Sequence, residues 1–233
     1  MLKKIFSKQN IDITDKQEKD FIDYREYIIE YNKIMDITNI TEEEEMYIKH
    51  FLDSVLISKS MINLDGKSII DIGTGGGFPG IPLKIMHPSI SLTLMDSLNK
   101  RIRFLEDVTT RLNLDNTISI HARAEELARN KKYRESYDIA TSRAVANLST
   151  LVEYCLAFVK VGGYFIAMKG PNYQEELDSA NNAINTMGGK IKEVIEYELP
   201  NNLGSRSLII VKKIKSTPPK YPRGQGKPKN NPL

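Results

Sequence analysis

The segment from Ser68 to Pro88 constrains the fold of this chain more than any other. It reads SIIDIGTGGGFPGIPLKIMHP, a short apolar run that ends near an acid and leads into a loop with five glycines. Glycine tolerates left-handed backbone conformations and lets a ligand approach the main chain closely. Pro79 and Pro82 suit the first turn of a helix. The segment therefore predicts a strand, a small-molecule cradle and a helix in succession.

The chain after this point alternates short apolar strands with amphipathic helical segments. Five strands joined by helices are expected, at 68–71, 91–96, 117–121, 137–141 and 163–169. This alternation is typical of a parallel sheet covered by helices on both faces. Two further strands follow one another without a helix between them, at 190–199 and 206–214. We expect an α/β fold with a seven-stranded sheet, an antiparallel last strand and a ligand site beyond the carboxyl ends of the strands.

A helical extension is expected over residues 1–65, before the sheet begins. Thr14 with Gln17, and Thr41 with Glu44, have the spacing of a helix cap and its partner. An apolar stripe with helical spacing is expected to pack against the sheet domain, and it consists of Phe21, Tyr24, Ile28 and Tyr31.

The sheet domain is expected over 66–215, and a basic tail rich in proline and glycine over 216–233. The tail has five prolines and too little apolar surface to fold alone. Seven of the 33 basic residues and none of the 30 acidic residues lie between Lys212 and Leu233, although the net charge is only +3. This asymmetry favours a polyanionic partner, and a merely solubilising tail is the alternative.

Several classes of protein are disfavoured by composition. No apolar stretch reaches membrane-spanning length and no signal core follows the N-terminus, so we expect a cytoplasmic protein without a membrane partner. The single Cys155 lies in an apolar run, which predicts a buried thiol and neither a disulfide nor a metal cluster.

Two acids indicate which ligand the glycine loop holds. The GGGFPG run matches the weak G-x-G-x-x-G pattern of dinucleotide enzymes. However, Asp71 with Gly73, Gly75 and Gly77 resembles the loop of class I S-adenosylmethionine-dependent methyltransferases, where a carboxylate suits a cationic amino group and sulfonium and would repel a pyrophosphate. Asp96 ends the next strand, where it can accept hydrogen bonds from two ribose hydroxyls in either cofactor class.

The segment after the fourth expected strand restricts the reaction. It reads TSRAVANLS, which lacks the Asn/Asp-Pro-Pro-Tyr/Phe motif of amino-directed nucleic-acid enzymes and a nucleophilic cysteine. His50, His87 and His121 are too scattered for a triad or a metal cluster, and each is read as a structural histidine. An acceptor with a free lone pair, such as N7 of guanine, needs no general base, because no proton has to leave.

Several motifs in order resemble one family. They are NITEEEEMYIKHFLDS, IIDIGTGGGFPGIPLKI, LMDSLNKRIRFL, HARAEEL, TSRAVANLSTL, YFIAMKG and the tail that begins with KYPR. The chain is identified on these motifs as similar to the RsmG family, also called GidB. The resemblance implies a class I Rossmann-like fold and S-adenosylmethionine as cofactor. It also implies methylation of N7 of the guanine conventionally numbered 527 in 16S ribosomal RNA.

The resemblance also implies site residues. Cofactor contacts are carried over to Gly73, Phe78, Ala124, Glu125 and Arg143, in addition to the loop glycines and acids named above. Arg143 and Lys169 are the catalytic candidates. Basic positions expected to bind RNA phosphate or the target base are Lys100, Arg123, Lys169, Arg206 and Arg223.

Other interpretations stay open at this point. Each basic residue has an exposed surface cation as its alternative, and for Arg101 and Arg103 surface solvation is the preferred interpretation. The expected partner is 16S ribosomal RNA or the small ribosomal subunit, bound by a monomer without a metal ion. Alternatives are a methyltransferase of the same fold that acts on another RNA or a small molecule, and a nicotinamide-dependent oxidoreductase.

Overall fold

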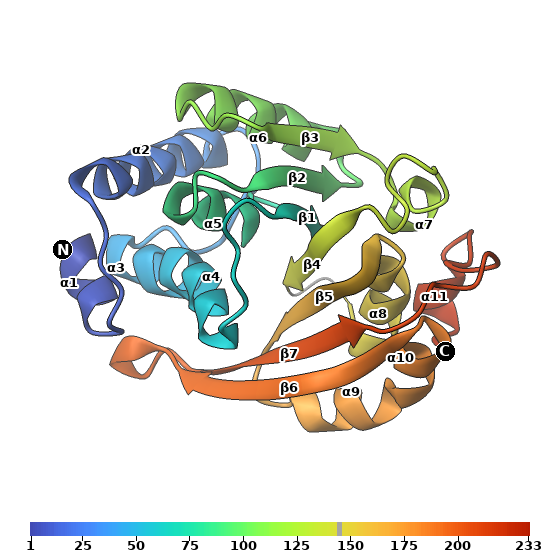
Figure 1. Cartoon of the computed structure of the whole chain (residues 1–233). Coiled ribbons are helices and arrows are strands. Elements are labelled where there is room, and N and C mark those ends of the chain that lie inside the picture. The colour runs from blue at the N-terminus through green and yellow to red at the C-terminus, as the bar shows by residue number, and fades with distance from the viewer. Residues whose placement is uncertain (144–145) are drawn as a thin grey trace.

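A single seven-stranded sheet forms the centre of the molecule (Figure 1). The computed structural model describes residues 1–143 and 146–233. In sheet order the strands are β3 (Thr117–His121), β2 (Ser91–Asp96), β1 (Ser68–Ile72), β4 (Tyr137–Arg143), β5 (Val159–Lys169), β7 (Ser205–Lys213) and β6 (Gly189–Glu198). The first five are parallel, and β7 is antiparallel to both of its neighbours. The expected α/β class, sheet and antiparallel last strand are confirmed.

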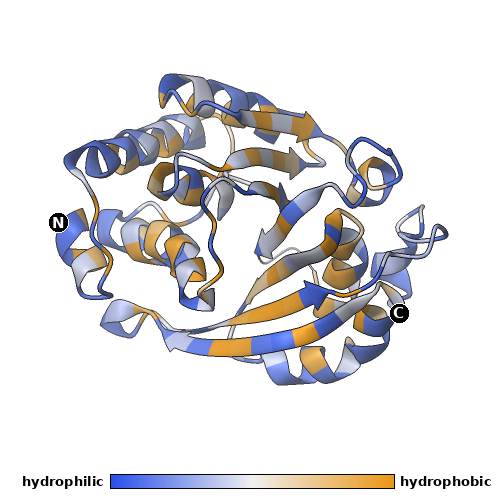
Figure 2. Cartoon of the chain, in the orientation of Figure 1, coloured by the Kyte–Doolittle hydropathy of each residue, from blue (hydrophilic) through white to orange (hydrophobic). Residues whose placement is uncertain are grey.

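The last two strands form the antiparallel end of the sheet, with the later strand inside. β7 lies between β5 and β6, which leaves β6 at the edge. The run from Leu208 to Val211 is fully buried, whereas β6 exposes about half of its residues. Figure 2 shows the same contrast, with β6 alternating in hydropathy and β7 largely hydrophobic. Because a central strand buries both faces, the continuously apolar strand takes the inner position.

Helices cover both faces of the sheet, and neighbouring strand residues face opposite cores. Ile69 of β1 belongs to the core on one face, and Ile70 to the core on the other. The first core is covered by α1 (Leu2–Ser7), α2 (Asp15–Asn32), α3 (Glu43–Met46), a π-helical turn (Tyr47–Leu52), α4 (Asp53–Val55), α5 (Gly80–Met86) and α6 (Asn99–Arg111). The second is covered by α7 (Ala124–Leu127), α8 (Leu148–Leu156), α9 (Tyr173–Ser179), α10 (Asn181–Thr186) and the tail with α11 (Lys227–Asn230).

The two predicted caps of the N-terminal extension have different outcomes. At α2 the Thr14 hydroxyl accepts from the Gln17 amide at 3.2 Å, and the Gln17 side chain accepts from the Thr14 amide at 2.9 Å. At α3 the predicted cap by Thr41 is wrong, because the carboxylate of Glu42 accepts from the Glu45 amide at 2.7 Å. A negative charge at a helix N-terminus is favoured by the helix dipole, which explains why the adjacent carboxylate takes this place.

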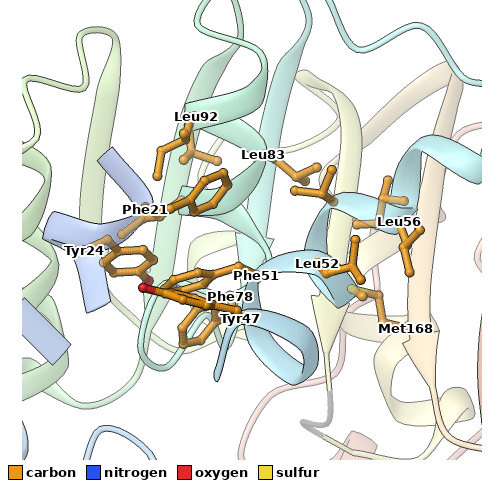
Figure 3. Close-up of a cluster of buried hydrophobic side chains, with 14 of the residues drawn as sticks. Phe21, Tyr24, Tyr47, Phe51, Leu52, Leu56, Phe78, Leu83, Leu92 and Met168 are labelled. Atoms are coloured by element: carbon orange, nitrogen blue, oxygen red, sulfur yellow. The ribbon is translucent and has the colours of Figure 1, made fainter. Parts of the chain in front are cut away.

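An aromatic cluster joins the N-terminal extension to the glycine loop (Figure 3). Phe21 and Tyr24 of α2 stack on Phe51 of the π-helical turn, and Phe78 of the loop packs against Tyr24. The Tyr24 hydroxyl donates to the Gly76 carbonyl. Of the expected apolar stripe on α2, Phe21, Tyr24 and Ile28 are buried and Tyr31 is partly buried against the same core, so the extension shares one core with the sheet.

The remaining expectations about the interior concern α8 and the tail. Cys155 is fully buried in α8, as expected. The tail packs on the second core, where Tyr221, Pro222 and Pro228 are buried. Among the described residues, no helix combines the length and apolar character needed to cross a membrane.

Candidate functional site

Two cavities lie at the carboxyl ends of the parallel strands, where the strand order reverses between β1 and β4. The larger cavity, about 780 Å³, lies between the glycine loop and the N-terminal extension. The smaller cavity, about 420 Å³, lies between α7, α8 and the tail. Gly73 and Ser97 line both. The two cavities therefore form adjoining halves of one site over the ends of β1 and β2.

Asp71 supports the glycine loop from beneath. It is fully buried, and its Oδ2 accepts from the Thr74 hydroxyl at 2.7 Å and from the Gly80 amide at 2.9 Å. Its Oδ1 has no hydrogen-bond partner within the described chain. Burial raises the pKa of Asp71 to about 6. Because Asp71 lines neither cavity, its described role is to hold the loop, and its predicted cofactor contact stays a prediction.

The loop glycines divide into an open and a packed set. Gly75, with φ of 59°, lines the larger cavity, and a Cβ added there would meet nothing within 4 Å. Gly77, with φ of 97°, faces the interior instead, where a Cβ would lie 2.5 Å from Ile81 Cδ1 and 2.6 Å from the Tyr24 hydroxyl. Gly75 is thus placed to contact a ligand, whereas Gly77 allows α2 and α5 to approach the loop.

Asp96 joins the glycine loop to the following loop. It is 2% exposed, and its carboxylate accepts from the Gly75 amide at 3.0 Å and the Leu98 amide at 2.9 Å. Arg101 Nη1 contacts the same carboxylate at 3.2 Å. Arg101 also lines the larger cavity, so its interpretation as a solvated surface cation is wrong. Nothing local distinguishes it from its neighbours in LNKRIRFL, since only the folded chain shows that its position faces Asp96.

Arg143 lies at the centre of a cluster that the sequence predicted only in part. Its guanidinium carbon lies 4.9 Å from the centroid of the Phe78 ring, and its Nη1 lies 3.2 Å from Asp53 Oδ2. The His50 ring also stacks on Phe78, with 4.5 Å between the ring centroids. His50 and Asp53 were missed, although their spacing of three in YIKHFLDS places both on one helix face.

The protonation state of His50 follows from its two partners. A guanidinium only donates, so His50 Nδ1 accepts from Arg143 Nη2 at 3.2 Å. The proton therefore resides on Nε2, which donates to the Thr38 hydroxyl at 2.7 Å. Burial and the adjacent Arg143 lower the pKa of His50 to about 3. His50 is a neutral ring whose nitrogens are both engaged, and it has no lone pair to offer as a base.

The five predicted RNA-binding cations do not form one cluster. Lys169 and Arg206 line the larger cavity, and Arg123 lines the smaller one. Lys100 is exposed on α6 and lines neither, and Arg223 is turned inward to a buried glutamate. The resemblance implied that Lys100, Arg123, Lys169 and Arg206 gather around the cofactor mouth, and of these four Lys100 lines neither cavity. RNA binding by the five residues stays a prediction.

Lys169, predicted as a catalytic residue, is held by two acceptors at the end of β5. Its Nζ donates to the Ala146 carbonyl at 2.6 Å and lies 2.6 Å from Glu176 Oε2. Glu176 Oε2 also accepts from the Leu148 amide at 2.7 Å. This arrangement fixes the ammonium at the cavity wall and joins β5 to α8 and α9.

The other predicted cofactor residues are distributed over both cavities. Gly73, Phe78, Asp96 and Arg143 line the larger cavity, and Ala124 and Glu125 line the smaller one. Glu125 is 5% exposed, and within the described chain no hydrogen bond or ion pair engages its carboxylate. The described residues contain no group of three His, Cys, Asp or Glu side chains placed to hold a metal ion.

Solved structures with the same fold include methyltransferases. A "SAM dependent methyltransferase from Aquifex aeolicus" superposes with a TM-score of 0.54 at 15% identity, covering 75% of this chain and 96% of that chain. A "SAM-dependent O-methyltransferase" from Thermotoga maritima gives a TM-score of 0.56 at 14% identity, with 82% and 73% covered. At this identity the likeness shows the fold, which is that of the class I methyltransferases.

Sequence relatives extend over almost the whole chain. The "Ribosomal RNA small subunit methyltransferase G" of Alkaliphilus oremlandii is 51% identical over 96% of this chain and 94% of its own length. The protein of that name from Lactobacillus acidophilus is 48% identical over 97% of this chain and 95% of its own length. The model of the GidB family, described as rRNA small subunit methyltransferase G, matches residues 17–204. This chain therefore belongs to the rRNA small subunit methyltransferase G family.

Proposed function

We propose that this protein transfers the methyl group of S-adenosylmethionine to N7 of a guanine in 16S ribosomal RNA, at the position conventionally numbered 527. The observation that carries the proposal is the family match over 17–204, in a chain whose strand ends bear a glycine loop and two adjoining cavities. We also propose that the reaction takes place in the cytoplasm on the small ribosomal subunit. The enzyme is proposed to act as a monomer.

The residues of the two cavities fit the proposed cofactor. Asp96 is a buried carboxylate at the end of β2, where it suits ribose hydroxyls as donors. Gly75 leaves open space above the loop, and Glu125 offers an unengaged carboxylate to the exocyclic amine of adenine. When bound, the cofactor supplies an electrophilic methyl group on a sulfonium.

The larger cavity is suited to hold a planar acceptor without deprotonating it. Arg143 and Phe78 make a cation–π pair, in which Phe78 also stacks on His50 and Arg143 also pairs with Asp53. Alkylation of a ring nitrogen through its lone pair needs orientation rather than a base. His50 is neutral with both nitrogens engaged, which agrees with this kind of acceptor. Lys169 and Arg206 add positive charge at the same cavity for phosphate contacts.

The test is methyl transfer from labelled S-adenosylmethionine to small ribosomal subunits that lack the modification, with naked 16S RNA as a parallel acceptor. We expect one N7-methylguanine, detected as a single cleavage in the decoding-region loop by chemistry selective for that base. Transfer to a different RNA, or no transfer by a protein that binds the cofactor, would contradict the acceptor. Failure to bind S-adenosylhomocysteine would contradict the cofactor itself.

A further inference from the structure

The tail is fastened to the second face of the sheet domain by a buried ion pair. Glu153 of α8 is fully buried, and Arg223 donates to its carboxylate from Nε at 3.0 Å and from Nη2 at 2.7 Å. The amide of Arg223 donates to the same carboxylate at 2.7 Å. Burying a carboxylate costs desolvation free energy, which is offset only when charged and hydrogen-bonding partners such as these engage it. The Arg223–Glu153 pair therefore fixes the direction of the chain at the middle of the tail.

Arginines from the segment after α7 fasten the tail through its main chain. Arg134 donates to the carbonyls of Thr217 at 2.9 Å and Tyr221 at 2.8 Å, and Arg129 donates to Pro222 at 3.1 Å. The result is a fixed course for the tail rather than a free basic arm.

The fastened tail supplies one wall of the smaller cavity. Gln225, Gly226, Lys229 and Asn230 line it from the tail, opposite Ala124, Glu125 and Tyr154 of the sheet domain. Gln225 and Gly226 both have left-handed backbone, with φ of 59° and 69°, which turns the chain across the cavity after Arg223. Ion pairing and turn geometry together place this segment over the unengaged carboxylate of Glu125.

We infer that residues 225–230 of the tail close over the adenosine end of the cofactor and belong to the cofactor site. This inference rests on the proposed function, because it concerns the same cofactor. The smaller cavity joins the glycine loop through Gly73 and Ser97, so a nucleoside that reaches from Asp96 to Glu125 passes beneath the tail. The tail then determines how tightly the nucleoside is held and how slowly it leaves.

The experiment compares S-adenosylhomocysteine binding by the full chain and by a chain that ends at Gly224. This truncation removes the lining residues and keeps Arg223, Glu153 and the contacts of Arg134. We expect the dissociation constant from calorimetry to rise about tenfold, as for the loss of one to two hydrogen-bonded contacts. An unchanged constant in a folded truncated chain would overturn the inference and leave the proposed function intact.

A second measurement keeps the test decisive if the truncated chain does not fold. Hydrogen exchange of the full chain is measured with and without S-adenosylhomocysteine, and we expect slower exchange in 224–230 as well as in the glycine loop. Slower exchange in the loop alone would overturn the inference. Absence of binding by the full chain would overturn both this inference and the proposed cofactor.

Two lysines of α11 form a matched control pair. Lys229 lines the cavity, whereas Lys227 is exposed on the same short helix and does not. Lys229→Ala is expected to weaken S-adenosylhomocysteine binding about threefold, with Lys227→Ala unchanged, because each removes one charge but only one removes a wall contact. If the two substitutions weaken cofactor binding equally, the tail acts only through its charge. That result would overturn the inference that residues 225–230 belong to the cofactor site.

Discussion

The N-terminal extension lines one cavity of the site and the C-terminal tail lines the other, but the two are attached to the sheet domain by different interactions. The extension is joined to the glycine loop by a buried aromatic cluster that includes Tyr24, Phe51 and Phe78. The tail buries Tyr221, Pro222 and Pro228 on the second core and is also held by an ion pair and by hydrogen bonds to its main chain. The two ends lie on opposite sides of the sheet domain in Figure 1. The extension is therefore attached through a large apolar cluster, whereas the tail combines a smaller apolar contact with a buried ion pair.

The largest effect is expected from Phe51→Ala. Phe51 is fully buried and stacks on Phe21 and Tyr24, so the substitution leaves a cavity where the extension meets the sheet. The free energy of unfolding should fall by about 3–5 kcal/mol. Urea denaturation measures it, with Ile34→Ala as the control because that side chain is 80% exposed. A loss below about 1 kcal/mol would show that the extension is not integral to the core.

Arg223→Ala tests the attachment of the tail and should have the second largest effect. It leaves the buried Glu153 carboxylate without its charged partner, which destabilises a fold by about 3 kcal/mol. The double variant Arg223→Met with Glu153→Met should recover most of that loss, because it removes the unpaired charge. Thermal unfolding of both variants gives the comparison, and equal melting temperatures would contradict a buried-charge cost.

Asp96→Asn probes the point where the glycine loop meets the following loop. The Gly75 and Leu98 amides bond different oxygens of Asp96, so the single amide oxygen of Asn keeps only one of these bonds, and the negative charge expected to favour the ribose hydroxyls is lost. Affinity for S-adenosylhomocysteine should fall roughly 100-fold, as expected for the loss of charged hydrogen bonds. Asp96→Ala should abolish activity by the same route with the fold intact. Calorimetry checks both variants, and wild-type affinity in either would refute the assignment of Asp96.

The smallest expected effect is on the pH dependence of the free energy of unfolding. It concerns His50 of the N-terminal extension and not the C-terminal tail. The pKa of His50 is lowered to about 3, so the stability it contributes is present above its unfolded pKa near 6.5 and is lost as pH falls below that value. The loss reaches up to about 1.4 kcal/mol per pH unit. Asp71, whose pKa is raised to about 6, acts in the opposite direction, because its buried charge is neutralised as pH falls through 6.

Because His50 and Asp71 change the free energy of unfolding in opposite directions as pH falls, the effect of His50 is measured as the difference between a variant and the wild type. We expect His50→Gln to gain stability relative to the wild type between pH 7 and pH 5, as followed by urea denaturation at each pH. The tail over 216–233 has no histidine, so hydrogen exchange at the Arg223 attachment should not follow this difference. A constant gap between variant and wild type across that range would show that His50 does not become charged on unfolding.

The sequence predicted those features that depend on local pattern. The apolar runs, the glycine loop and the Thr14 cap follow from spacing along a few residues, and all agree with the structure. The missed contacts join charged residues that are far apart in the chain, such as Arg143 with Asp53 and Arg223 with Glu153. A guanidinium that faces solvent and one that faces a buried carboxylate look alike in sequence. Only the folded topology determines which of them finds a partner.

Gly73 and Ser97 line both cavities, and this has a thermodynamic consequence for ligands bound in them. Gly73 follows β1 and Ser97 follows β2, so a ligand in either cavity lies against the same two strand ends. Linkage requires any coupling between the two cavities to be reciprocal, so the factor by which the cofactor changes the affinity for the acceptor equals the factor by which the acceptor changes the affinity for the cofactor. The order in which they arrive changes the rate at which the ternary complex forms and leaves its stability unaltered.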